Sequence, residues 1–241
     1  MPEQNTPDDG PVPIAGRDDR PAALARLPVG RHGLPREFVE ENQRNRLIAA
    51  ALEVFTARGY AEGSVAEVIA AAGVSRKTYY AHFTDKEGSL LATGDVVVAW
   101  LTGQATHAVR DVDGWARAVV AVVRSLTALL GEDPRLARLL TVELLRAGAP
   151  ARARHEALIE RLAAGLRAGR ELGGCAAELP ASLDCFLVEG AVSIVTRLAL
   201  FGEGRTVSGL ACELSELLLA PYVGGPVEAH RLVTDAGRPR R

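Results

Sequence analysis

The chain has 241 residues, enough for one or two domains with a sizeable core, and 48% of its residues are hydrophobic while only 5% are aromatic. A formal net charge of −2 excludes a uniformly basic surface, so any contact with nucleic acid must come from a local patch. The longest stretch without a charged residue, Val96 to Val109, is shorter than the roughly 20 residues of a membrane helix, and three cysteines without CxxC spacing favour a cytoplasmic protein with reduced thiols.

Residues 1–35 mix Pro, Gly, Asp and Arg without periodicity, and we expect them to form a flexible N-terminal arm. The acidic, Pro-rich start has no apolar core and is therefore no signal peptide. The end of the arm is locally basic through Arg26, Arg31, His32 and Arg36. An arm of this kind can enter the minor groove beside a helix-turn-helix, and a solvated tail accounts for the same composition equally well.

A helix is predicted from about Glu37 to Arg58, where apolar side chains recur on one stripe, and Gly59 ends it. Ser64 to Glu67 then has the spacing of a capping box, in which each side chain accepts a hydrogen bond from the other residue's backbone N–H. This spacing predicts that a second, short helix begins here.

A tight turn and a third helix follow. Gly73 supplies the turn, and Ser75 can cap a helix that ends near Phe83. Residues 84–87 again have capping-box spacing and begin a long fourth helix. Two short helices joined by a turn and braced by a helix on each side form a helix-turn-helix. The pattern therefore predicts a DNA-binding domain over residues 36–90.

The composition of the third helix supports this interpretation. Both lysines of the chain, Lys77 and Lys86, lie in this region together with two of its four tyrosines. Cations that hold phosphate and rings that carry hydroxyl groups are typical of a recognition helix. Ser64, at the start of the second helix, can donate to a phosphate as well as cap. The exposed N-terminal turns of the third helix are predicted to contact bases in a major groove through Arg76, Lys77, Thr78 and Tyr79.

These residues resemble the N-terminal domain of the TetR, or tetracycline-repressor-like, family of transcription regulators. Agreement is nearly continuous over residues 46–91 and includes the sequences AGVS at 72–75 and TYYAHF at 78–83. The pair Arg76-Lys77 departs from the small residue that is common before Thr78 in the family. The resemblance implies phosphate contacts from Tyr80, His82 and Lys86. The complete predicted DNA-binding set is Ser64, Ser75, Arg76, Lys77, Thr78, Tyr79, Tyr80, His82 and Lys86.

Residues 91–223 show further helical patterns without strand-like alternation, and residues 224–241 are expected to be a C-terminal tail. Helices are predicted at 135–146, 151–172, 180–201 and 207–220. The predicted fold class is all-α, with an N-terminal three-helix helix-turn-helix domain followed by a C-terminal helical domain. The resemblance implies that this second domain binds a ligand and mediates dimerisation.

A ligand cavity among these helices needs a few polar groups set in an apolar wall. Candidates can be chosen by residue type only: Trp100, His107, Trp115, Glu143, His155, Phe186 and Glu189. The aromatic residues of this set are more often plain core, and the His and Glu residues can simply be solvated. The Ala, Leu and Val content favours an apolar or amphipathic effector, and the lack of a cationic cluster disfavours a highly anionic one.

The last two predicted helices are apolar on more than one face, and such helices must bury a second face. We expect that face to contact a twin subunit, since a two-fold symmetric dimer matches a palindromic operator. The predicted interface residues are Ile194, Val195, Leu198, Leu214, Leu217 and Leu218. Packing within one chain stays open as an explanation for some of them.

Together these patterns predict a sequence-specific DNA-binding regulator that works as a homodimer, most simply a repressor that an unknown small molecule releases from its operator. No catalytic residue, cofactor, metal site or membrane segment is expected. One alternative is an activator or nucleoid-type binder that responds to no ligand. Another is an all-α enzyme, but the sequence shows no nucleophile–base pair and no group of metal ligands.

Overall fold

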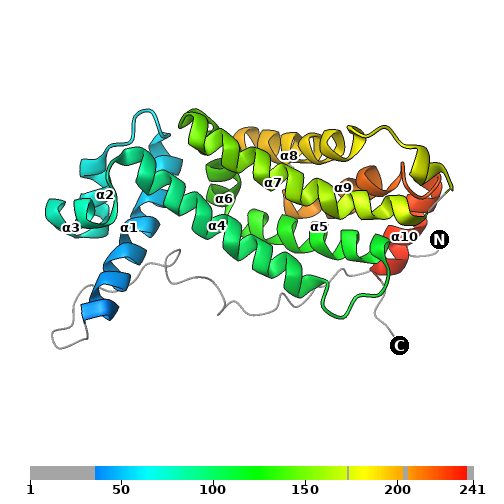
Figure 1. Cartoon of the computed structure of the whole chain (residues 1–241), viewed down its shortest axis with the longest axis horizontal. Coiled ribbons are helices and arrows are strands. Elements are labelled where there is room, and N and C mark those ends of the chain that lie inside the picture. Colours follow the sequence, from blue (N-terminus) through cyan, green and yellow to red (C-terminus); the bar gives the residue numbers. More distant parts are fainter. Residues whose placement is uncertain (1–35, 173, 203–205, 238–241) are drawn as a thin grey trace, which may run out of the picture.

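The computed structural model describes residues 36–172, 174–202 and 206–237, and within these ranges the chain is helical and contains no strand. The all-α fold class predicted from the sequence is confirmed. The predicted N-terminal arm, residues 1–35, lies outside the described residues. The molecule is elongated, with a small helical unit at one end and a larger bundle forming the rest (Figure 1).

The small unit consists of α1 (Arg36–Arg58), α2 (Val65–Ala72) and α3 (Arg76–His82). The capping box at the start of α2 forms as predicted, because Ser64 and Glu67 each accept from the other's backbone N–H. Gly73 has a φ of 60° and provides the left-handed residue that ends α2. The Ser75 side chain accepts from the Thr78 N–H and caps α3. These bonds join near neighbours in the chain, so local spacing is enough to predict them.

α4 (Lys86–Ala108) joins the small unit to the larger bundle, since it packs against both α1 and α5 (Trp115–Glu132). The structure corrects the predicted cap of α4. Asp85 rather than Thr84 is the N-cap residue, and its Oδ1 accepts from the Gly88 N–H at 2.7 Å. An aspartate at this position also interacts favourably with the positive end of the helix dipole.

The larger bundle contains α4 and α5 together with α6 (Pro134–Arg138), α7 (Ala149–Arg167), α8 (Leu183–Phe201), α9 (Ala211–Leu219) and α10 (Pro226–Ala236). Asp133 caps α6 and Pro134 takes its first position. The predicted α-helix to Arg146 is interrupted, however, because the chain forms a π-helical turn at Leu139–Glu143 and a 3-10 turn at Leu144–Arg146. Further 3-10 turns flank the later helices at Ala168–Leu172, Gly174–Glu178 and Ser208–Leu210.

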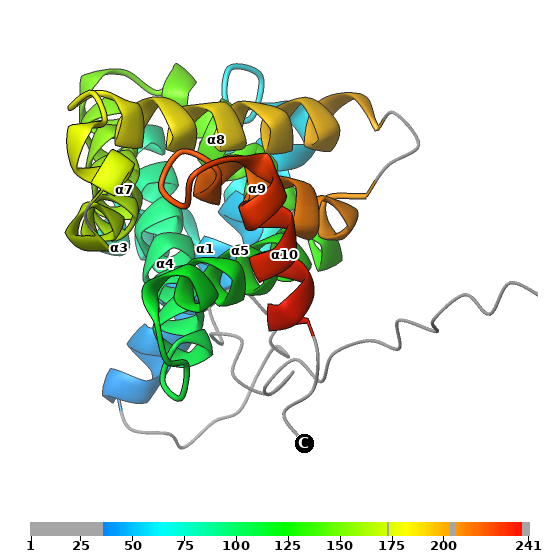
Figure 2. The same cartoon turned by 90° about the vertical axis from the view of Figure 1, so that its right-hand side faces the viewer.

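Helix α10 lies within residues 224–241, which the sequence predicted to be a C-terminal tail, so that prediction is wrong, whereas the preceding helix ends at Leu219, close to the predicted residue 220. Ala229 and Val233 are buried, and α10 packs against α5 and α9 (Figure 2). Val227 of the same helix is 84% exposed. A stripe of only a few apolar residues is a weak local signal, and the helix is held mainly by the surface it covers.

The apolar core of the small unit continues into the bundle. Phe55 of α1 and Leu90 of α4 belong to the same buried cluster as Leu136 and Leu144. Leu144 approaches α4 closely at Gly94, where an added Cβ would lie 2.9 Å from the Leu144 Cδ1. Because this core is close-packed across the junction, the small unit is held against the segment that follows α6.

Candidate DNA-binding surface and ligand cavity

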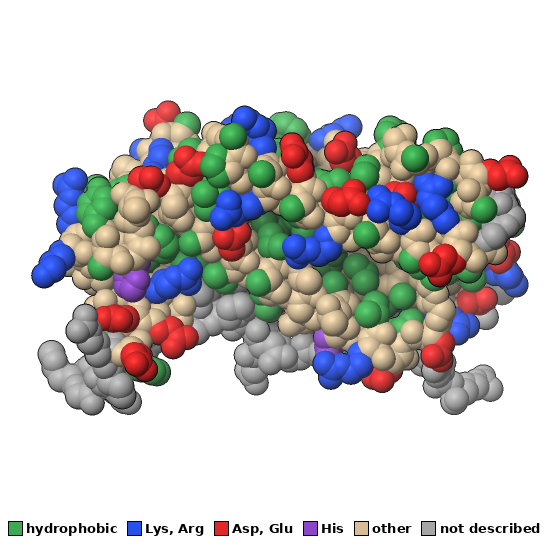
Figure 3. Space-filling model, viewed as in Figure 1, with side chains coloured by type: hydrophobic (Ala, Val, Ile, Leu, Met, Phe, Trp, Pro, Cys, Tyr) green, Lys and Arg blue, Asp and Glu red, His purple; other side chains and the backbone are tan. Residues whose placement is uncertain are grey.

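Helix α3 presents basic and aromatic side chains to solvent at one end of the molecule. Arg76, Lys77 and Tyr80 are exposed, and the Arg76 guanidinium lies over the Tyr80 ring, 5.6 Å from its centroid. Lys and Arg side chains are visible at this end of the molecule in Figure 3. Two cations and a phenolic hydroxyl on one exposed face are suited to phosphates and base edges in a major groove.

The structure contradicts the prediction that Tyr79 faces the bases. Its side chain is fully buried, and its hydroxyl donates to the Asp85 carbonyl at 2.9 Å. Its ring meets those of Tyr80 and Phe83, with centroid separations of 5.3 and 5.7 Å. Successive residues of an α-helix point about 100° apart, so Tyr79 and Tyr80 cannot both face the DNA. Tyr79 takes the inward position and Tyr80 the outward one.

The hydroxyl groups predicted at this surface are used inside the motif. Ser64 Oγ donates to Glu67 Oε2 at 2.8 Å, and the hydroxyl oxygens of Ser75 and Thr78 lie 2.8 Å apart. Ser75 stays exposed beside the basic pair of α3. Ser64 acts as a cap in the structure, and a phosphate contact from its hydroxyl would replace a bond that holds the start of α2.

Lys86 closes the loop between α1 and α2. Its Nζ donates to the carbonyls of Tyr60, Ala61 and Gly63 at 2.7, 3.3 and 3.1 Å, and lies 4.3 Å from the centroid of the Tyr60 ring. An ammonium group has three donors, and all three are engaged here. Lys86 therefore has a role inside the small unit, and the phosphate contact that the resemblance implies stays a prediction.

His82, near the end of α3, is half-buried. Burial, followed by the charge of Arg44, lowers the pKa of its imidazole, and Glu40 opposes this shift only in part. The ring is therefore mainly neutral at neutral pH. A phosphate placed beside it would favour the protonated form, so contact with DNA would raise the pKa again.

Sequence reasoning missed the structural role of Arg46. Its guanidinium donates to the carbonyls of Ala72 and Gly73, the latter at 2.8 Å. These carbonyls lie at the end of α2, where helical partners run out. The contact braces the helix-turn-helix against α1. Because the partners are 26 residues apart, no local pattern identifies them.

A cavity of about 480 Å³ lies within the larger bundle, walled by side chains of α4 to α9 and of the π-helical turn. This volume is within the ~300–1,000 Å³ of small-molecule sites. The wall is almost entirely aliphatic, with side chains such as Leu101, Val123, Leu162 and Val192. In Figure 3 apolar side chains line a hollow between α7 and α4. The cavity can accept a hydrocarbon chain but offers few partners for polar groups.

Two of the residues predicted to line a ligand site, Trp115 and His155, do line this cavity. The remaining residues of the predicted set lie outside the wall of this cavity: Trp100, His107, Glu143, Phe186 and Glu189. Most of the set is simply exposed, while Trp100 packs on the core shared with the small unit. Residue type alone does not tell which side of a helix faces inward.

Glu143 connects the bundle to the small unit. It is fully buried at the end of the π-helical turn, and its Oε2 accepts from the Tyr60 N–H at 2.7 Å. Its carboxylate also pairs with Arg138 at 3.0 Å and with Arg146 at 3.7 Å. Leu140 of the same turn lines the cavity. One turn of chain therefore touches the cavity and the small unit at once.

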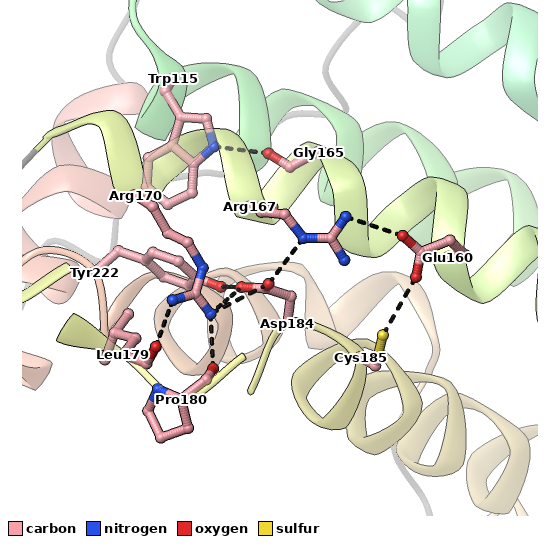
Figure 4. A network of polar contacts seen from close by, with 10 residues as sticks. All are labelled: Trp115, Glu160, Gly165, Arg167, Arg170, Leu179, Pro180, Asp184, Cys185 and Tyr222. Atoms are coloured by element: carbon pink, nitrogen blue, oxygen red, sulfur yellow. Dashed lines mark hydrogen bonds and ion pairs between the residues drawn. The ribbon is translucent and has the colours of Figure 1, made fainter. Parts of the chain in front are cut away.

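A buried carboxylate, Asp184, is at the centre of a network of hydrogen bonds and ion pairs (Figure 4). It accepts from the Tyr222 hydroxyl and pairs with Arg170 at 3.1 Å and Arg167 at 3.3 Å. Burial alone would raise the pKa of Asp184, but the hydrogen bonds from Tyr222 and Arg170 and the arginine charges outweigh it and lower the pKa. The Trp115 ring, on the cavity wall, packs on Tyr222 with centroids 5.1 Å apart. The network ties α5, α7 and α8 to the segment after α9.

Most of the residues predicted at a dimer interface pack inside the chain instead: Ile194, Val195, Leu198, Leu214 and Leu218. The intrachain packing that the sequence left open accounts for them. Leu217 is different, since it is 49% exposed. On the outer face of α8, Phe186 and Phe201 are each 71% exposed, and Gly190 lies on the same stripe. A Cβ at Gly190 would meet no atom within 4 Å.

Residues 47–93 match the sequence profile of the bacterial regulatory proteins of the tetR family. No curated protein sequence matches the chain. The fatty acid degradation regulator FadR from Bacillus halodurans is similar with a TM-score of 0.67 and 22% identity, over 74% of this chain and 95% of that one. FadR from Bacillus subtilis, solved in complex with stearoyl-CoA, has a TM-score of 0.64 and 21% identity, over 73% and 97%. Thermus thermophilus FadR, a TetR-family transcriptional repressor solved with lauroyl-CoA, has a TM-score of 0.54 and 25% identity, over 74% and 94%.

The profile match covers the helix-turn-helix region, and the structural likeness, over 74% of this chain, shows the fold of these regulators. The similar proteins are transcriptional regulators, a class of proteins that are not enzymes. Within the described ranges, no group of His, Cys, Asp and Glu side chains is placed to hold a metal ion. The described helices also include none with the length and apolarity needed to cross a bilayer.

Proposed function

We propose that this chain, a transcriptional regulator of the TetR family, is a repressor that binds a palindromic operator as a homodimer and leaves it when an apolar small molecule fills the cavity. The observation that carries the proposal is the position of the cavity. Its wall includes parts of two elements, α4 and the π-helical turn, that also hold the DNA-binding unit. A ligand in the cavity can therefore act on the unit through either element.

The first route runs along α4. Leu101 and Thr102 of this helix line the cavity, while Lys86 at its start holds the loop between α1 and α2 through three carbonyl groups. A helix transmits a displacement along its length because its backbone bonds are continuous. If α4 moves aside for a ligand, the loop and the helix-turn-helix attached to it move with it.

The second route runs through the π-helical turn. Leu140 and Thr141 line the cavity, and Glu143 accepts from the Tyr60 N–H on the other side of the turn. Repacking of Leu140 around a ligand would shift the carboxylate that holds the small unit in register. The effect requires that the ligand binds the released conformation more tightly than the DNA-bound one.

The cavity wall indicates the class of effector. Aliphatic side chains dominate it, and a long hydrocarbon chain would bury its surface there without leaving polar groups unpaired. The structurally similar FadR proteins were solved with stearoyl-CoA and lauroyl-CoA. Fatty acyl compounds are therefore the first class to test.

The homodimer is proposed to form through the outer faces of α8 and α9. Phe186, Phe201 and Leu217 expose apolar surface there, and the open position at Gly190 lets another helix approach closely. A two-fold axis through this face would place the two α3 helices symmetrically for a palindromic site. This interface replaces most of the residues that the sequence predicted.

Selection of bound fragments from genomic DNA would identify the operator, and fluorescence anisotropy on that fragment would then measure release by fatty acyl compounds. We expect a palindromic consensus, affinity that falls steeply with salt, and release by compounds that fill the cavity. Binding without sequence preference would refute the operator proposal. A complex that survives every compound shown to bind the protein would refute the release mechanism.

The dimer proposal is tested by sedimentation of the double variant Phe186→Glu, Leu217→Glu. Two charges on the proposed apolar face should convert a wild-type dimer into monomers. Val227→Glu is the matched control, because it adds a charge at an exposed apolar residue of α10 instead. A double variant that remains dimeric would place the interface elsewhere, and a monomeric wild type would rule out the homodimer.

A further inference from the structure

The cavity wall carries one permanently charged side chain, Arg161 of α7. Among the described residues that line the cavity there is no Asp, Glu or Lys and no second Arg. Arg161 is exposed, so its guanidinium stands at the mouth and not in the interior. The otherwise aliphatic wall contains no carboxylate to pair with this cation, and its exposure leaves it available to a ligand.

Four polar side chains of the wall already donate to backbone carbonyls. Three threonines donate to carbonyls one turn earlier in the chain, at 2.7 to 2.8 Å: Thr106, Thr127 and Thr141. The Trp115 indole donates to the Gly165 carbonyl at 2.8 Å. These donors need nothing from a ligand. The interior is therefore suited to hydrocarbon, and the charged donor is confined to the mouth.

Arg161 also differs from two other arginines of α7, Arg154 and Arg167. Arg154 bonds both carboxylate oxygens of Asp95, at 2.8 and 3.2 Å, and Arg167 pairs with Glu160 at 2.9 Å. Arg161 contacts only the Thr102 hydroxyl of α4, at 3.5 Å, within the part of the chain that the structure describes. Its guanidinium thus reaches from α7 towards α4 across the mouth without a carboxylate to neutralise it.

We propose that the effector is a long-chain carboxylic acid, whose chain fills the cavity and whose carboxylate is held by Arg161 at the mouth. This inference rests on the proposed function, because it takes the cavity as the effector site. A guanidinium binds a carboxylate through two parallel hydrogen bonds. One cation matches one negative charge, whereas the several phosphate charges of a coenzyme A thioester would meet no second Lys or Arg on the described wall. The head group would thus differ from those of the stearoyl-CoA and lauroyl-CoA complexes.

The test compares three probes of equal chain length, dodecanoic acid, dodecanol and dodecanoyl-CoA, by isothermal titration of the full chain. The wild type should bind the acid about 10-fold to 100-fold more tightly than the alcohol, the range expected for a charged hydrogen-bonded pair. Arg161→Gln should lose this preference, and Arg161→Lys should keep part of it because the charge remains. Arg152→Gln, which removes an exposed arginine of α7 outside the cavity wall, should leave the preference unchanged.

Three results would overturn the inference and leave the effector site in place. They are equal affinity of the wild type for acid and alcohol, an Arg161→Gln variant that keeps the preference, and tighter binding of dodecanoyl-CoA than of the acid. If none of the three probes binds, the proposed function fails together with this inference. The two failures are therefore distinguishable.

Discussion

Replacing Glu143 by Gln tests whether the domain junction carries the effector signal. The substitution keeps the size of the side chain, but it removes the negative charge and turns one acceptor oxygen into an NH2 donor. The two carboxylate oxygens of Glu143 accept from the Tyr60 N–H and from Arg138 Nε in a fully buried site. The NH2 group of the new amide must therefore face either the Tyr60 N–H or the Arg138 Nε–H, and two donors that face each other form no hydrogen bond.

The expected loss of unfolding free energy depends on how exposed the two arginine partners of Glu143 are. Removing one member of a fully buried ion pair costs about 3–5 kcal/mol. Here the Arg138 and Arg146 side chains are 35% and 57% exposed, so water can replace part of the lost interaction. We expect Glu143→Gln to lower the unfolding free energy by about 2–3 kcal/mol, near the value of one charged hydrogen bond. For a chain of this length, that is a fall in Tm of roughly 4–12 °C.

Two measurements check this prediction, with Glu156→Gln as a control that removes one charge from an exposed site on α7. Calorimetry should show the fall in Tm only for Glu143→Gln. Operator affinity measured with and without effector should change by a smaller factor in this variant than in the wild type, because the bond from the π-helical turn to Tyr60 is weakened. A Glu143→Gln protein that matches the control in Tm and in effector response would refute the proposed coupling.

Three further predictions concern charge. The pKa of His82 is lowered in the free protein and a phosphate beside it would raise it, so operator affinity should increase about fivefold as the pH falls into the acidic range, and His82→Gln should abolish this increase in a binding assay. Lys77→Ala should lower the slope of log affinity against log salt by about one, whereas Lys86→Ala should mainly lower Tm; equal slope changes would contradict the roles assigned to the two lysines. The pKa of Asp184 is lower in the folded protein than in the unfolded chain, where it is about 3.9. The ionised carboxylate therefore stabilises the fold above a pH of about 3.9, and this stabilisation is lost as the pH falls through the pKa of the folded state. Tyr222→Phe removes a hydrogen bond to Asp184 and so raises the pKa of this carboxyl in the folded protein. The stability measured by urea unfolding should then begin to fall at a higher pH than in the wild type, and an unchanged pH profile would count against the network.

The helix-turn-helix was predictable in detail because its determinants are local. Ser64 with Glu67, Gly73 and Ser75 each act on residues within one turn of helix, so spacing in the sequence indicates the bond. The choice between Tyr79 and Tyr80 was not predictable in this way. Both are adjacent aromatic residues of one type, and only the packing of α3 on its neighbours decides which ring is buried.

The candidate ligand site was predictable only as a class. Aliphatic helices in the second half of the chain indicate an apolar interior, but the wall draws side chains from α4 through α9. Arg161 looks like any other arginine of an arginine-rich helix in the sequence. Its separation from carboxylates and its place at the mouth depend on how α7 lies against α4.

By itself the sequence determined the all-α class, the helix-turn-helix and its caps, and the two lysines near the recognition helix, because these depend on bonds between near neighbours. Only the tertiary structure decided that Lys77 faces solvent while Lys86 closes a loop of carbonyls, and that Glu143 joins the larger bundle to the small unit. The same holds for α10, which is stabilised by the surface it covers. The physical reason is the same for the two lysines, for Glu143 and for α10. Each depends on contacts between residues far apart in the chain, and those contacts are set by which helix faces meet when the whole core packs.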